Sequence, residues 1–98
     1  MEKLVRDRIP ELMRASGLAP RSRRAKPEEV LDLLFRKLHE EVDELQEKPG
    51  VEELVDITEV LRRICEVLGV GFPELEQARL SKARSRGAFE DNVVLILD

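Results

Sequence analysis

The chain is 98 residues long, the size of one ordinary domain, so we expect residues 1–98 to form a single folding unit. Its composition, 42% hydrophobic, 39% charged and 3% aromatic, favours amphipathic helices over a sheet and predicts an all-α fold. The 17 basic residues do not outnumber the 21 acidic ones, and the apolar runs are too short to span a membrane, so neither a DNA partner nor a membrane partner is expected. Cys65 is the only cysteine, which excludes an internal disulfide, and the charged N-terminus lacks the apolar core of a signal peptide, so the expected location is the cytoplasm.

Proline and glycine residues divide the chain into predicted helices. Pro10 suits the first turn of a short helix that ends near Gly17, and residues 17–27 are predicted to form a loop with four basic side chains. Pro27, followed by two glutamates, predicts the start of a long helix that runs to about residue 48. A Pro-Gly pair then ends that helix, and a second long helix is expected from about residue 51 to residue 68.

The two long helices are joined by so short a turn that they must pack as an antiparallel hairpin. Pro73 predicts the start of a third helix, which ends near Gly87. Residues 93–97 form an unbroken apolar run, for which a short strand or an extended docked segment is favoured over a helix. The expected fold is therefore a long-helix hairpin with flanking helices. A helical chain this short buries little of its surface, so we expect oligomerisation to complete its core.

Acidic residues occur in pairs on the two long helices, close to the turn between them. Glu41 lies roughly 60° from the centre of the apolar stripe of the first helix, and Glu44 about 60° further round. Glu53 and Asp56 lie roughly 80° and 140° from the centre of the stripe of the second helix. Because the turn brings the pairs together, burial and mutual repulsion would oppose ionisation of all four carboxylates. A hard cation removes that conflict, and oxygen-only ligands indicate Mg²⁺, with Mn²⁺ as a second possibility.

The same glutamates also have a simpler interpretation, as the solvated face of a helix. Glu44 is four residues before Lys48, and Lys37 is four residues before Glu41. Each such pair stabilises a helix by only about 0.3–0.5 kcal/mol. The first acidic string alone favours this interpretation, whereas the second pair, in register across a short turn, favours a metal site.

The apolar face of the second long helix is broad. Its stripe is expected to centre on Leu61, and Cys65 falls within it as a small buried side chain. Apolar residues spread well beyond a narrow stripe, and this breadth is typical of a helix that also forms a subunit interface. The residues concerned are Val51, Leu54, Val60 and Val67.

Three stretches of the sequence resemble one known superfamily. The string KLHEEVDEL followed by EELVD resembles the paired acidic signature of the MazG-type nucleotide pyrophosphohydrolases. The opening KLVRDRIPEL and the ending KARSRGAFEDNVVLI resemble its phosphoribosyl-ATP pyrophosphohydrolase-like branch, so the resemblance covers nearly the whole chain in order. Two features depart from the family pattern. The connection between Glu44 and Glu53 is shorter than usual, and Val30 stands where an aromatic residue is often found.

The resemblance implies an α-helical homodimer or homotetramer that uses Mg²⁺ to hydrolyse nucleoside triphosphates between the α and β phosphorus atoms, giving a monophosphate and pyrophosphate. Glu40 and Glu41 are the expected catalytic acids, with Glu40 orienting the water. The metal ligands carried over by position are Glu41, Glu44, Glu53 and Asp56. Cations should bind the phosphates of the nucleotide substrate. The candidates are Lys3, Arg6, Arg8, Arg24, Lys37, Lys82 and Arg86.

Two other functions are consistent with the sequence. One is the phosphoribosyl-ATP step of histidine synthesis, which ranks lower because the N-terminal motif marks the "like" branch. The other is a non-catalytic helical dimer that acts as a regulator or adaptor and is not stabilised by metal ions. The presence of all four acids at the expected helical positions favours an enzyme over this last interpretation.

Overall fold

The computed structural model describes residues 1–97, and this part of the chain is all-helical, without a strand. A short 3-10 helix, Pro27–Glu29, leads directly into the second of the α-helices. The predicted helices are therefore confirmed. The α-helices are α1 (Ile9–Ala15), α2 (Val30–Glu47), α3 (Val51–Leu68) and α4 (Phe72–Arg86).

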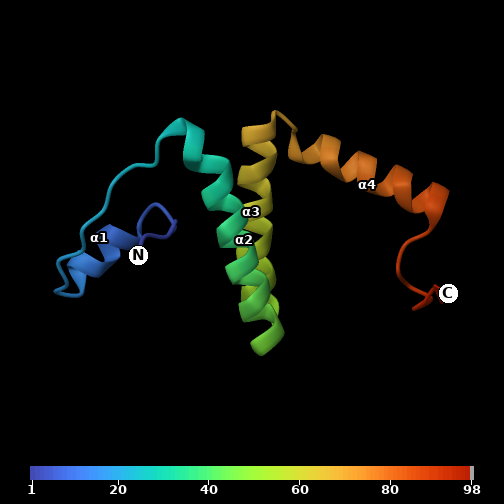
Figure 1. The fold of residues 1–98 in the computed structure, drawn as a ribbon, viewed down its shortest axis with the longest axis horizontal. Coiled ribbons are helices and arrows are strands. Elements are labelled where there is room, and N and C mark those ends of the chain that lie inside the picture. The colour runs from blue at the N-terminus through green and yellow to red at the C-terminus, as the bar shows by residue number, and fades with distance from the viewer. Residues whose placement is uncertain (98) are drawn as a thin grey trace.

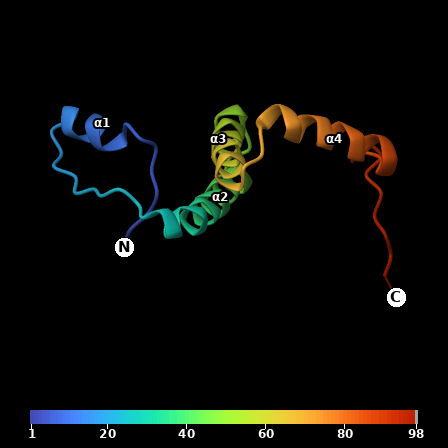
Figure 2. The same ribbon diagram turned by 90° about the horizontal axis from the view of Figure 1, so that it is seen from above.

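The turn between α2 and α3 follows from Pro49 and Gly50. Pro49 has no backbone N–H to donate, and α2 ends before it, at Glu47. The N–H of the next residue, Lys48, still donates to the Glu44 carbonyl oxygen at 2.9 Å. The Gly50 carbonyl oxygen then accepts from the N–H of Leu54 at 3.2 Å, which begins α3. The turn is so short that α2 and α3 lie side by side and antiparallel, as both views show (Figure 1, Figure 2).

The core of the hairpin is small. Leu34, Val60 and Ile64 form its buried cluster, and Leu38 is among the half-buried residues packed against them. The buried face of α3 therefore centres between Val60 and Ile64, about 80° from Leu61, which is 38% exposed. The predicted centre of this stripe was wrong, because apolar residues cover so much of α3 that α2 can bury only one side of them. Cys65 is buried, as predicted.

The last part of the chain lies apart from the hairpin. α4 starts after the α3 terminus at Gly69, which has a left-handed φ of 76°, and it extends away from α2 and α3 in both views (Figure 1, Figure 2). Residues 93–97 form neither the predicted strand nor a docked segment, since their side chains are 77–86% exposed. The radius of gyration is 17.5 Å, whereas a compact domain of this length has about 13 Å. None of the helices in the described residues is long and apolar enough to cross a membrane.

Candidate metal centre

Three of the predicted site residues lie together on one flank of α2. Glu40, Glu41 and Glu44 each offer a carboxylate oxygen, and these oxygens all lie within 4.8 Å of one another. Glu44 follows Glu41 by three residues and Glu40 by four, and residues at both spacings are neighbours on a helix surface. Glu41 is buried, Glu40 is half-buried and Glu44 is exposed, so the cluster runs from the hairpin core out to solvent.

Glu41 is the one buried charged side chain in the part of the chain that the structure describes, with 5% of its surface exposed. Its Oε1 atom lies 3.3 Å from Nζ of Lys37. Its Oε2 atom is buried and has no hydrogen-bond partner among the described residues. Leaving such an oxygen unsatisfied costs roughly 1–3 kcal/mol, and more for a charged group. This oxygen atom therefore fits the role of a metal ligand.

The charges at the cluster do not balance. Lys3 and Lys37 supply two cations, with Nζ atoms 3.1 Å and 3.4 Å from Glu40 oxygens, against three carboxylates. The hydrogen bond from Lys3 lowers the pKa of Glu40, and the negative charge of Glu41, followed by burial, raises the pKa of Glu44. A divalent cation would relieve the repulsion that raises the pKa of Glu44. The oxygen-only donor set fits Mg²⁺ or Mn²⁺.

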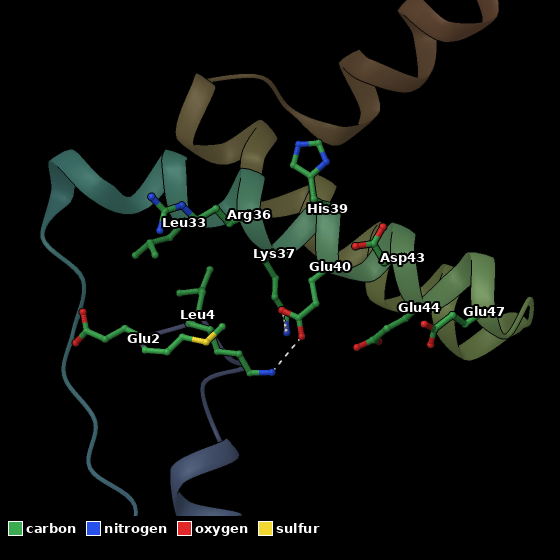
Figure 3. A pocket seen from close by; sticks show the side chains of 12 residues that line it. Glu2, Leu4, Leu33, Arg36, Lys37, His39, Glu40, Asp43, Glu44 and Glu47 are labelled. Atoms are coloured by element: carbon green, nitrogen blue, oxygen red, sulfur yellow. Dashed lines mark hydrogen bonds and ion pairs between the residues drawn. The ribbon is translucent and has the colours of Figure 1, made fainter.

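A groove of about 520 Å³ lies between the N-terminal segment and this flank of α2. Leu4 and Leu33 lie at one end, where Glu2 and Arg36 also line the groove, and Lys37, Glu40 and Glu44 lie toward the other end (Figure 3). Glu40 and Glu44 point toward the same side of α2 as the N-terminal segment, while His39 points the other way (Figure 3). The groove thus combines an apolar wall with the acidic cluster.

The second predicted pair of ligands, on α3, does not join the cluster. Among the described residues, neither Glu53 nor Asp56 belongs to a group of three acids with oxygens this close together. The Asp56 Oδ1 atom instead lies 2.6 Å from Nη2 of Arg6. The Glu53 carboxylate turns back over the start of α3, where its Oε1 would lie 2.9 Å from a Cβ atom added at Gly50. A negative charge is favoured at that position by the positive end of the helix dipole.

The predicted phosphate-binding cations fall into two groups. Lys3 and Lys37 lie at the acidic cluster, and Arg6 lies beside it on Asp56. The others lie elsewhere in this single chain: Arg8 pairs with Glu11 on α1, Arg24 is in the loop before α2, and Lys82 and Arg86 are on α4.

Arg23 holds the N-terminal segment against the start of α2, a role that the sequence did not reveal. Its guanidinium donates to Glu2 at 2.9 Å and to Glu29 at 2.7 Å, and the Lys26 N–H also donates to Glu29, at 2.8 Å. The Arg23 hydrogen bond, followed by that from the backbone, lowers the pKa of Glu29 from 4.5 to about 2. Glu2 is the residue before Lys3, so this contact joins the loop before α2 to the segment that carries Lys3 to Glu40. A pair 21 residues apart leaves no local pattern by which it could have been predicted.

The chain resembles a known protein over only part of its length. No protein-family model matches the chain, and no solved structure matches it. An uncharacterized protein of Mycolicibacterium smegmatis is 54% identical to it over 46 residues, which are 47% of this chain and 47% of that protein. The aligned part thus spans about half the length of that relative.

Proposed function

We propose that this protein is a Mg²⁺-dependent nucleotide pyrophosphohydrolase of the MazG type, which cleaves nucleoside triphosphates between the α and β phosphorus atoms. One observation carries the proposal: the unpartnered Oε2 atom of the buried Glu41, in a cluster of three carboxylates. A carboxylate is buried in this way at a substantial cost unless a cation completes it. The resemblance of the acidic strings and of both chain ends to this superfamily supports the same conclusion.

In this proposal the acidic residues of α2 have two roles, metal binding and orientation of the attacking water. Glu41 and Glu44 would hold the ion, which neutralises charge on the phosphate oxygens when it is bound. Glu40, at the solvent side of Glu41, would accept a hydrogen bond from the attacking water. For Glu53 and Asp56 to join the ligand set, the Glu53 carboxylate would have to leave the start of α3 and Asp56 would have to release Arg6.

Two lysines are placed to bind the phosphate chain of the substrate. Lys3 and Lys37 now pair with Glu40, at 3.1 Å and 3.4 Å. Both can exchange a carboxylate for a phosphate oxygen. The water oxygen then bonds to the α phosphorus atom and its proton passes to a nearby carboxylate, while the bond to the bridging oxygen breaks and pyrophosphate leaves. Phosphoryl transfer of this kind depends on positioning and charge neutralisation more than on covalent chemistry.

The groove is suited to a nucleotide in shape and polarity. A base placed against Leu4 and Leu33 would leave the phosphates at the charged end, beside Lys37 and Glu40. A cytoplasmic location, where Cys65 stays a free thiol, and a homo-oligomeric state belong to the same proposal.

Pyrophosphate release from a panel of nucleoside triphosphates tests the proposal, with Mg²⁺ or EDTA present. The panel includes phosphoribosyl-ATP, whose selective hydrolysis would identify the histidine-synthesis reaction instead. The variants are Glu41→Gln, expected to lower the rate at least about a hundredfold, and Glu76→Gln on α4, expected to leave it unchanged. No release from any substrate, with a melting temperature unaffected by Mg²⁺, would favour the non-catalytic adaptor.

A further inference from the structure

The N-terminal segment crosses the acidic side of the hairpin as a strap, a name we use for residues 2–6. The strap contains neither helix nor strand, and within the described chain its only backbone hydrogen bond is at its end, where the Arg6 carbonyl oxygen accepts at 3.1 Å. Side chains hold it in place instead. Leu4 packs against the buried cluster between α2 and α3, and Arg23 holds Glu2 at 2.9 Å. The strap can therefore move without breaking secondary structure.

The two cations of the strap pair with carboxylates on both long helices. Lys3 Nζ lies 3.1 Å from Glu40 on α2, and Arg6 Nη2 lies 2.6 Å from Asp56 on α3. Glu40 belongs to the acidic cluster, and Asp56 is one of the two metal ligands that the sequence predicts on α3. The strap thus places a positive charge on one carboxylate from each half of the predicted metal site.

These two ion pairs are open to exchange. The side chains of Lys3 and Arg6 are 57% and 53% exposed, and their carboxylate partners are 31% and 36% exposed. Ion pairs this open to water contribute little stability, because water screens them and ordering a long side chain costs entropy. The buried Glu41 differs, since its Oε2 atom has no hydrogen-bond partner among the described residues. A divalent ion drawn to Glu41 therefore competes with the strap cations for the neighbouring carboxylates.

The charge of the acidic cluster indicates that an ion must bind before a phosphate chain does. The two lysines at the cluster face three carboxylates, which leaves one negative charge. A polyphosphate is repelled by this charge, and both lysines are occupied by carboxylates. A bound divalent ion changes the balance to one positive charge and takes over the carboxylates. The released cations then lack an acidic partner and can bind phosphate oxygens.

We propose that the strap is an ion-triggered switch, whose Lys3 and Arg6 bind carboxylates of the site before the ion arrives and phosphates of the substrate afterwards. Arg6 is its central residue, because Asp56 can act as a ligand only after Arg6 has left it. The site then accepts a polyphosphate together with a divalent cation and rejects the free polyphosphate. The switch rests on the proposed function, because it needs an ion at the acidic cluster. The contact between Arg23 and Glu2 does not involve the cluster and stays closed.

The first test compares metal affinity and phosphate affinity in one variant, Arg6→Gln. Mn²⁺ binding, measured by electron paramagnetic resonance, should tighten about two- to fivefold, because Asp56 loses its competing cation. Pyrophosphate binding, measured by calorimetry at saturating Mg²⁺, should weaken about tenfold or more, because a charged donor to the phosphate is lost. An Arg6 that serves only the fold would weaken both. Arg79→Gln breaks an ion pair with Glu76 on α4 and is the control, which should change neither affinity.

Two results of this test would overturn the switch and leave the metal site intact. One is a Mn²⁺ affinity that is unchanged or weaker in Arg6→Gln. The other is pyrophosphate binding that depends on neither Arg6 nor Mg²⁺. If neither the wild type nor Arg6→Gln binds Mn²⁺, the metal site of the proposed function fails, and the switch fails with it.

The second test follows the strap in the wild type and needs no variant. Side-chain NMR during a Mg²⁺ titration measures how fast the guanidinium protons of each arginine exchange with water. Exchange at Arg6 should become faster as Mg²⁺ binds, because its contact with Asp56 opens. Arg23 is the internal control and should not change, because its partners, Glu2 and Glu29, are not members of the cluster. Unchanged exchange at Arg6, in a protein that binds Mn²⁺, would overturn the switch.

Discussion

The two sides of the α2–α3 hairpin differ in chemistry: one carries clustered charges and the other carries exposed apolar side chains. The acidic side gathers three carboxylates, and the N-terminal segment brings Lys3 to one of them, Glu40. The opposite side carries Leu54, Leu61 and Leu68 of α3, which stay exposed within the chain. The chain therefore supplies cations for part of the acidic cluster but leaves much of its apolar surface uncovered. Chemistry is expected on the first side and assembly on the second, and the two can be changed separately.

The largest change in the free energy of unfolding is expected in the buried core between α2 and α3, which supports both sides of the hairpin. Ile64→Ala should lower the free energy of unfolding by about 2–4 kcal/mol, because Ile64 is one of only a few buried apolar residues. Urea unfolding of Ile64→Ala measures this loss, and Leu61→Ala on the same helix serves as the comparison. If Leu61 faces solvent, its truncation should cost under about 0.5 kcal/mol at any concentration. If a homo-oligomer covers Leu61, its truncation instead costs more than that value, and the urea midpoints of both proteins rise with protein concentration.

A smaller gain in stability is expected on the acidic side when the metal is absent. Glu41→Met should raise the free energy of unfolding in EDTA by about 1 kcal/mol, since it removes a buried carboxylate with one unpartnered oxygen. Adding Mg²⁺ should stabilise the wild type and leave the variant unchanged. Urea unfolding with and without Mg²⁺ checks this. A Glu41→Met protein that is much less stable in EDTA would show that Glu41 serves the fold rather than a metal.

A further prediction concerns competition between Lys3 and the metal. Lys3→Ala removes the cation that neutralises Glu40, so Mn²⁺ affinity should rise about two- to fivefold. The pKa of Glu40, now lowered by Lys3, should rise at the same time. Titration with Mn²⁺ and NMR of the glutamate side chains check both effects. Arg79→Ala, which removes the cation paired with Glu76 on α4, is the control and should change neither.

The smallest effect is expected at the contact between Arg23 and Glu29. The pKa of Glu29 is depressed from 4.5 to about 2, so this contact stabilises the fold above about pH 4.5, and the contribution is lost as pH falls toward 2. In Arg23→Ala the pKa of Glu29 should move back toward 4.5, and the loss should begin at higher pH. An NMR pH titration checks this. An unchanged Glu29 pKa would show that Arg23 does not hold the N-terminal segment.

The features that could be predicted from the sequence are those set by residues close together along the chain, such as helix ends and side chains on one flank of a helix. Pro49 and Gly50 determined both ends of the turn, and Glu41 and Glu44 meet because they share one flank of α2. The rotation of α3 about its own axis could not be predicted, because its apolar residues allow several buried faces. The placement of Glu53 and Asp56 relative to α2 depends on that rotation and on the short turn.

The proposed chemistry requires that the acidic cluster hold a divalent ion. Mn²⁺ binding measured by electron paramagnetic resonance, with the wild type, Glu41→Gln and Glu76→Gln, tests this without a substrate. We predict saturable binding to the wild type and Glu76→Gln, weakened at least about tenfold in Glu41→Gln. Equal Mn²⁺ binding by all three proteins, or none by the wild type, would contradict a metal site at Glu41.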